Sequence, residues 1–182
     1  MIELQITSTS ITEPVLVDEV KTFMGFPSAD TSQDALIMTL ISSARKWLED
    51  YTSLSVVPKA YKARFEKEDA DSEGYFWLPV SPVIGTPAVS VNGTSVTFLQ
   101  KGLEIIRVMP SATYSTVTGN EESHYCDVTF TAGKKNETAN MIIMGIVADL
   151  FNNRNSENTI SMGRLSYNVV RMINSISLNI GL

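Results

Sequence analysis

The chain has 182 residues, 43% of them hydrophobic, and a formal net charge of −6. At this length a globular fold buries roughly 70% of the surface that its unfolded chain exposes, so one hydrophobic core can form without disulfides or a structural metal. The acidic balance argues against a protein built to grip nucleic-acid phosphates, but it allows one that DNA merely passes. The single cysteine, Cys126, forbids an intrachain disulfide.

The sequence shows no export signal and no membrane span. Residues 1–14 lack the basic and apolar regions of a signal peptide. The most apolar run, residues 141–150, contains Asp149 and is too short to cross a bilayer. We therefore expect a protein that is made and kept in a reducing cytoplasm and has no membrane partner.

Two helices are expected in the N-terminal third. Residues 1–15 alternate weakly and predict an extended arm, and residues 17–24 predict a short helix that Gly25 ends. The second helix has the clearest pattern, because a capping-box-like Thr31-x-x-Asp34 precedes apolar residues with a 3.6-residue period over four turns. Its apolar positions are Leu36, Ile37, Leu40, Ile41, Ala44, Trp47, Leu48 and Tyr51.

The middle of the chain changes to period two, which predicts strands. Two of them are expected at residues 57–65 and 75–80. The dipeptide Asn92-Gly93 predicts a hairpin over residues 89–98, because these two residue types supply the positive φ angles of a type I′ turn. The remaining predictions for this region are strands at residues 103–108 and 125–131 and a polar loop from Ser111 to Ser123.

Helical periodicity returns in the C-terminal quarter. Asn136 suits the N-cap of a helix whose apolar stripe ends at Phe151. A polar break, Asn152 to Thr159, separates it from a weaker amphipathic segment, residues 165–176. The predicted fold class is α+β, with a helical frame from the N- and C-terminal segments and a β-hairpin-rich middle of antiparallel strands. One domain over residues 1–182 is expected, with N-terminal helices (1–54), a β-rich lobe (55–133) and C-terminal helices with a docking tail (134–182).

No residue pattern indicates catalysis or a bound metal. His124 and Cys126 would share one face of a strand, but zinc needs three or four protein ligands and the chain has no other His or Cys. The acidic run that starts at Asp69 resembles a calcium loop, yet its twelfth position is Val80 rather than an acid. Phosphate loops and nucleophile elbows are missing from the sequence. We therefore expect a protein that is not an enzyme, with no catalytic residue, no metal and no cofactor.

Six short strings follow one another along the chain. They are Val17-Asp-Glu-Val-Lys21, Asp34-Ala-Leu36, Trp47-Leu-Glu-Asp-Tyr-Thr52, Leu78-Pro79, Val128-Thr-Phe-Thr-Ala-Gly133 and Leu165-Ser-Tyr-Asn-Val-Val-Arg171. Each string alone could belong to many folds. Their order and spacing together resemble the head–tail connector, or adaptor, family of tailed bacteriophages, and the resemblance extends over about residues 15–178.

The resemblance implies a structural subunit at the head–tail interface of a virion. Copies would form a ring, with twelve in the virion, below the portal protein, and genomic DNA would pass through without sequence-specific binding. One face would dock on the portal and the other would receive a stopper or tail protein. The expected docking residues are Leu165, Tyr167, Val169, Arg171, Met172, Ile173, Ile176 and Leu178. The expected assembly loop contains Asn153, Arg154, Asn155 and Glu157.

The amphipathic C-terminal segment agrees with a docking role, because a thin apolar stripe after a polar linker is suited to binding a partner. The same stripe could instead pack on the core of its own chain. Two other functions stay open from the sequence. One is a stopper or tail-completion subunit, which a less helical circular dichroism spectrum would favour. The other is a small ligand-binding domain or enzyme, which a pocket that binds a metabolite would favour.

Overall fold

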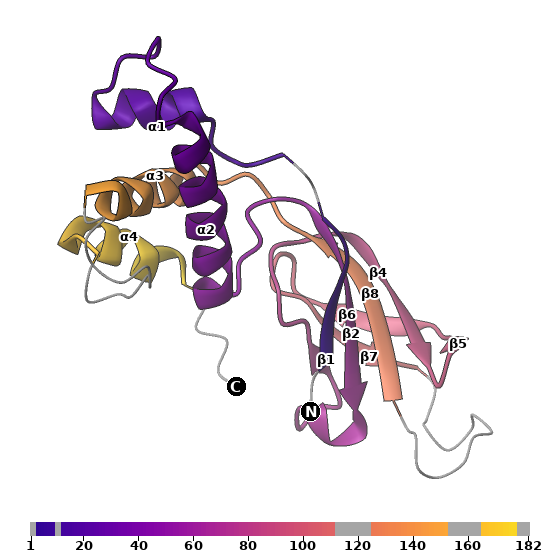
Figure 1. The fold of residues 1–182 in the computed structure, drawn as a ribbon. Coiled ribbons are helices and arrows are strands. Elements are labelled where there is room, and N and C mark those ends of the chain that lie inside the picture. The colour runs from indigo at the N-terminus through magenta and orange to yellow at the C-terminus, as the bar shows by residue number, and fades with distance from the viewer. Residues whose placement is uncertain (1–2, 10–11, 112–124, 153–164, 178–182) are drawn as a thin grey trace. The chain divides into compact units, whose positions relative to one another are not determined.

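The computed structural model describes residues 3–9, 12–111, 125–152 and 165–177. The chain divides into two compact units. Unit 1 contains residues 1–10 and 58–134 and all the described strands, and unit 2 contains residues 11–57 and 135–182 and the four α-helices (Figure 1). Antiparallel strands from the middle of the chain and helices from its two ends confirm the predicted α+β class. The expectation of one domain in three consecutive parts stays a prediction.

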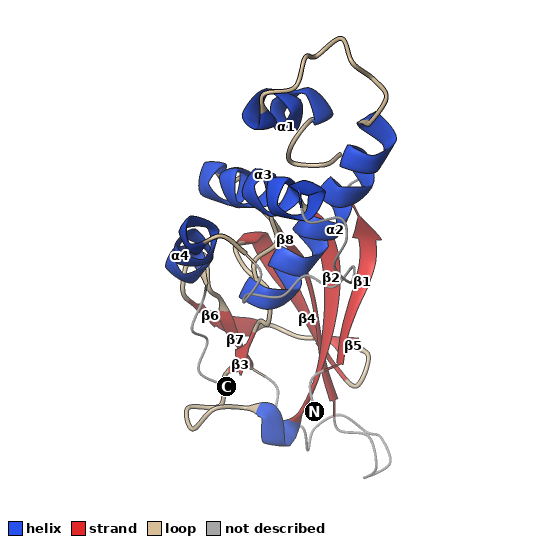
Figure 2. Ribbon diagram, turned by 60° about the vertical axis from the view of Figure 1, so that its left-hand side comes forward, coloured by secondary structure: helices blue, strands red, loops and turns tan. Residues whose placement is uncertain are grey.

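Unit 1 is built from two antiparallel sheets (Figure 2). The larger has the order β1 (Glu3–Thr9), β2 (Lys59–Glu66), β8 (Tyr125–Ala132), β4 (Val83–Val91) and β5 (Thr94–Ser95). The smaller has the order β3 (Phe76–Trp77), β7 (Arg107–Pro110) and β6 (Phe98–Lys101), and a 3₁₀ turn, η1, covers Lys67–Asp69. The predicted extended arm therefore forms strand β1, which pairs with β2.

The core of unit 1 follows the predicted alternation of β2. Tyr61, Ala63 and Phe65 are buried, whereas Lys62 and Arg64 alternate with them on the opposite face. Buried residues of both sheets join them in one apolar cluster, in which the ring of Phe65 lies 5.0 Å from that of Phe76. The alternation fixes the register, because a shift by one residue would turn the apolar set to the opposite face of the sheet.

The predicted hairpin is present between β4 and β5. Asn92 and Gly93 have φ angles of 49° and 82°, as a type I′ turn requires. The Asn92 side-chain oxygen also accepts a hydrogen bond of 3.1 Å from the backbone N–H of Tyr125. The turn residue thus connects the hairpin to the first residue of β8.

The strand predicted over residues 103–108 is wrong in its bounds. Residues 102–105 form the turn between β6 and β7, and the second strand begins only at Arg107. Gly102 explains the break, because its φ is 92° and a Cβ atom there would collide with the Ile105 carbonyl. The strand predicted over residues 75–80 is likewise reduced to the two residues of β3.

Unit 2 contains α1 (Val17–Met24), α2 (Asp34–Thr52), α3 (Glu137–Asn152) and α4 (Tyr167–Ile176). Their apolar faces form one cluster, to which each of the four helices contributes. Its largest fully buried apolar side chains are Ile37, Ile41, Leu48, Ile142, Ile143, Ile146 and Ile173. Each such side chain contributes roughly 1.5–3 kcal/mol of hydrophobic burial.

Local capping explains two of the helix ends, and a third predicted cap is absent. Helix α1 has the predicted bounds, and Gly25 ends it with a φ of 76°. The predicted cap of α3 is confirmed, because the Asn136 side-chain oxygen accepts from the Thr138 backbone N–H at 2.9 Å. The predicted cap of α2 is wrong: Gln33 precedes the helix without a side-chain cap, and the Asp34 carboxylate binds Lys21 instead.

Candidate functional site

Helix α4, the predicted docking element, packs its apolar side on its own unit. Val169 and Ile173 are buried in the helical cluster. Close approach to α3 is possible because residue 145 is glycine, where a Cβ atom would lie 2.5 Å from Val169 Cγ2. The half-buried members of the predicted set that pack against the same cluster are Leu165, Met172 and Ile176.

Two residues of the predicted set are exposed on α4. The Tyr167 side chain is 74% exposed, and the Arg171 guanidinium lies 5.8 Å from the centre of its ring. These two side chains form a small cationic and aromatic surface that a partner can reach. Sequence periodicity alone did not separate them from the buried residues of the same helix. The docking role of the whole set stays a prediction.

Several predicted site residues lie outside the described residues. This applies to Leu178 and to most of the polar loop from Ser111 to Ser123. It also applies to the expected assembly-loop residues Asn153, Arg154, Asn155 and Glu157. Their roles therefore stay predictions.

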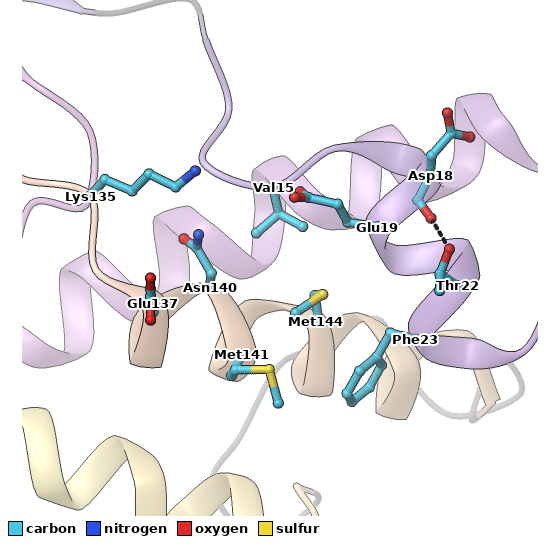
Figure 3. Close-up of a pocket in the computed structure, with 10 residues that line it drawn as sticks. All are labelled: Val15, Asp18, Glu19, Thr22, Phe23, Lys135, Glu137, Asn140, Met141 and Met144. Atoms are coloured by element: carbon cyan, nitrogen blue, oxygen red, sulfur yellow. Dashed lines mark hydrogen bonds between the residues drawn. The ribbon is translucent and has the colours of Figure 1, made fainter.

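An open groove of about 750 Å³ runs between α1 and α3 (Figure 3). Its apolar lining comes from Val15, Phe23, Met141 and Met144. Phe23 and Met141 are exposed, which is unusual for two large apolar side chains that lie together. The charged side chains that line it are Asp18, Glu19, Lys135 and Glu137.

The groove offers shape and apolar surface rather than a reactive group. Asn140 also lines it, and its side-chain oxygen is buried without a hydrogen-bond partner among the described residues. The Thr22 hydroxyl, which also lines the groove, donates to the backbone carbonyl of Asp18 at 2.8 Å rather than to a side-chain base. No pattern in the sequence indicated this groove. The exposed positions of Phe23 and Met141 depend on how α1 and α3 pack, which periodicity does not report.

Cys126, which the sequence raised as a possible reactive or metal-binding residue, has a structural role. Cys126 is fully buried, and burial raises the pKa of its thiol to about 12, so it is not a thiolate near neutral pH. Its sequence neighbour His124 lies outside the described residues. No cluster of three possible metal ligands occurs in the part of the chain that the structure describes.

The acidic turn before β3 is held by Asp71. One carboxylate oxygen accepts from the backbone N–H groups of Glu73 and Tyr75, both at 2.9 Å, and the other accepts from Arg107 at 2.8 Å. The Tyr75 N–H is the main reason why the pKa of Asp71 lies below its usual value. Both oxygens of the Asp71 carboxylate therefore accept hydrogen bonds within the protein. These bonds explain the acidic run that starts at Asp69 as part of a turn.

A family model described as phage gp6-like head-tail connector protein matches residues 15–92. The resemblance to head–tail connectors is confirmed over this range. The range begins before α1 and ends in the β4–β5 turn, so it draws on both units. The predicted extent of about residues 15–178 is longer than this match. No curated protein matches the sequence.

Chains in solved structures of gene transfer agent particles share the fold over almost the whole chain. A chain in the neck of an empty gene transfer agent particle, computed with C6 symmetry, is 14% identical with a TM-score of 0.71, and 99% of this chain and 97% of that chain are covered. A chain in the virion of a native gene transfer agent particle is 15% identical with a TM-score of 0.72, over 98% and 97% of the two chains. A third, in the neck of a native particle computed with C12 symmetry, gives 12% identity, a TM-score of 0.62 and coverage of 98% and 97%.

None of the helices in the described residues is long and apolar enough to cross a membrane.

Proposed function

We propose that this chain is a structural subunit of a head–tail connector ring in the neck of a virion. The observation that carries the proposal is the agreement of two findings: the connector family model matches residues 15–92, and chains in the neck of gene transfer agent particles share the fold over almost the full chain. Such a subunit works by shape and contacts. The roles found for Cys126 and Asp71, as a buried strand residue and a turn residue, agree with that.

The partners follow from the same proposal. Copies of the chain form a closed ring, twelve in the virion, and the ring sits between the portal protein and a stopper or tail protein. Genomic DNA passes through the centre, and the net charge of −6 disfavours tight binding of the phosphate backbone. Helix α4 meets the portal while it stays packed in unit 2, so the contact uses the exposed Tyr167 and Arg171.

The test measures mass in solution. Light scattering on the purified protein, alone and mixed with the cognate portal protein, should give either a ring or a complex of fixed stoichiometry with the portal. A chain that remains a monomer and does not bind the portal at any concentration would contradict the proposed function.

The docking role of α4 has its own test. Tyr167→Ala combined with Arg171→Glu should raise the dissociation constant for the portal at least tenfold, while the circular dichroism spectrum stays unchanged, because both side chains are exposed. Lys46→Glu on α2 is the matched control, since it reverses an exposed positive charge in the same unit. Equal weakening by both variants would assign the effect to net charge rather than to α4.

A further inference from the structure

Strand β1 is an edge strand of the larger sheet as far as the described residues show. Among the described strands it pairs only with β2. Leu4 and Ile6 are 42% and 51% exposed, although they lie opposite the buried Ala63 and Tyr61. The apolar face of the sheet therefore continues past its covered part. The strand, Glu-Leu-Gln-Ile-Thr-Ser-Thr, has neither the proline nor the lysine that commonly protects an edge, and its pairing with β2 is regular from Glu3 to Ile6, before an irregularity between Ile6 and Ser8.

The other end of the same sheet is protected. Between Ile84 and Ala88 the pairing of β4 with β8 is irregular, and this stretch contains Gly85, with a φ of 74°, and Pro87, which has no N–H to donate. The strand beyond it, β5, has only two residues. Both β1 and β4 contain an irregularity, but only this end also has a proline and a two-residue last strand, which are usual devices that prevent strand addition. The two ends of the sheet thus differ in their capacity to accept a strand.

Strand β6 is a second open edge, at the end of the smaller sheet. It pairs with β7 over four residues, and none of the described strands covers its other side. Leu99 on β6 is 55% exposed, and Leu103 in the following turn is 91% exposed. In Figure 2, β1 and β6 lie on opposite sides of unit 1.

We propose that β1 of one copy pairs with β6 of the next copy, and that this edge-to-edge contact links neighbouring subunits. The occupant is a second copy because a contact between two different edges on opposite sides of a unit propagates from subunit to subunit, which a ring requires. Pairing of β1 with itself would instead form a two-fold dimer and stop. Strand β1 has seven residues and is long enough to pair with all four residues of β6, and Leu4 or Ile6 would cover Leu99. The inference rests on the proposed ring.

Engineered disulfides test the contact directly. The only natural cysteine, Cys126, is buried and has a pKa of about 12, so introduced cysteines are the reactive thiols of the native protein. Chains that carry Leu99→Cys together with either Leu4→Cys or Ile6→Cys are oxidised and separated on a denaturing gel without reductant. We expect a ladder of linked multimers from at least one double variant and none from the single variants. Ile84→Cys with Leu99→Cys is the matched control, because Ile84 is an exposed apolar residue on the protected edge.

The outcomes separate this contact from the proposed function. Linked dimers from Ile6→Cys alone would show that β1 pairs with itself and overturn the inference. Rings, alone or on the cognate portal, that give no ladder from either double variant would also overturn it and leave the proposed function standing. A chain that neither assembles nor binds the portal would contradict both.

A charge substitution in β1 tests the same contact by a second method, the mass of the assembled protein. Ile6→Lys should reduce the mass of the assembled protein toward that of the monomer, because lysine on an edge strand opposes strand addition. Met38→Lys, at an exposed position on α2, should leave the mass unchanged. An assembled mass that is the same for Ile6→Lys and wild type would argue against the contact.

Discussion

The ammonium of Lys21 lies 2.9 Å from Oδ1 of Asp34, although the Lys21 side chain is only 2% exposed. Lys21 also donates to the Ser28 carbonyl at 2.9 Å, so one buried cation joins α1, the following loop and the start of α2. Burying a charge is costly unless it is paired, and removing only one partner leaves that cost uncompensated. The pair therefore fixes the α1–α2 connection.

The two partners of this pair should respond differently to substitution. Asp34→Ala leaves the buried ammonium without its carboxylate and should lower the free energy of unfolding by about 2–3 kcal/mol, a value reduced because Asp34 is partly exposed. Lys21→Met removes the charge and keeps the apolar stem, so it should cost about 1 kcal/mol. The measurement is urea unfolding followed by Trp47 fluorescence in a Trp77→Phe background, which reports on unit 2.

The double variant provides the control. Lys21→Met combined with Asp34→Ala should be no less stable than Asp34→Ala alone, because no buried charge remains. Additive losses in the double variant would mean that the two side chains act independently.

Asp127 makes the stability of unit 1 dependent on pH. Burial raises the pKa of this carboxyl, but hydrogen bonds from Arg64 and Lys62 outweigh burial and hold the pKa below its ordinary value of 3.8. A depressed pKa in the folded state stabilises the fold above the unfolded value, and this contribution is lost as pH falls through the folded pKa. We therefore expect Asp127→Asn to cost about 1–2 kcal/mol at pH 7, because its partners are partly exposed.

The difference in free energy of unfolding between wild type and Asp127→Asn should become smaller as pH falls below about 4. It is measured by urea unfolding with Trp77 fluorescence in a Trp47→Phe background. Glu104→Gln, at an exposed acid of the same unit, should follow the wild-type curve. A difference that stays constant down to pH 3 would show that Asp127 does not titrate with folding.

Residues that act on their immediate neighbours were predictable from the sequence, and long-range partners were not. Asn136 and Asn92-Gly93 act through the nearby backbone, so the α3 cap and the hairpin turn followed from residue type. The Thr31 cap failed because Asp34 binds Lys21, thirteen residues earlier, which a local pattern does not contain. Local residue types do not specify the pairing of β1 with β2, whose paired residues lie 50 or more positions later in the chain.

The candidate surfaces show the same limit. The amphipathic pattern of α4 correctly marked an apolar stripe, but only packing decides that Val169 faces α3 while Tyr167 faces outward. The groove between α1 and α3 and the open edge of β6 arise where elements meet or end. Neither has a signature within its own segment.

Cys126 should resist thiol reagents in the folded protein. It is fully buried between β2 and β4, opposite Phe65 and Val91, and its pKa is about 12. We expect the reaction with a disulfide reagent at pH 8 to be at least 100-fold slower in the native protein than in urea, because both access and thiolate formation require opening of the sheet. A native rate close to that in urea would show that the sheet opens readily at β8.

The close approach of α3 and α4 depends on Gly145. In an ordinary helix interior, alanine is more stable than glycine by about 0.8–1.0 kcal/mol. Here a Cβ atom would lie 2.5 Å from Val169 Cγ2, so Gly145→Ala should instead destabilise unit 2, by about 1–3 kcal/mol. Urea unfolding followed by Trp47 fluorescence measures the change.

Adding Val169→Ala to Gly145→Ala gives the Cβ atom room, so the two substitutions should couple favourably by at least about 1 kcal/mol.

The same pair tests how α4 docks. If the exposed Tyr167 and Arg171 bind the portal from a packed α4, Gly145→Ala should weaken binding and Val169→Ala should restore it in the double variant. If α4 instead docks by releasing its apolar face, Gly145→Ala should strengthen binding, because the helix is already loosened. Stronger binding would therefore move the docking site from the exposed pair to the buried Val169 and Ile173.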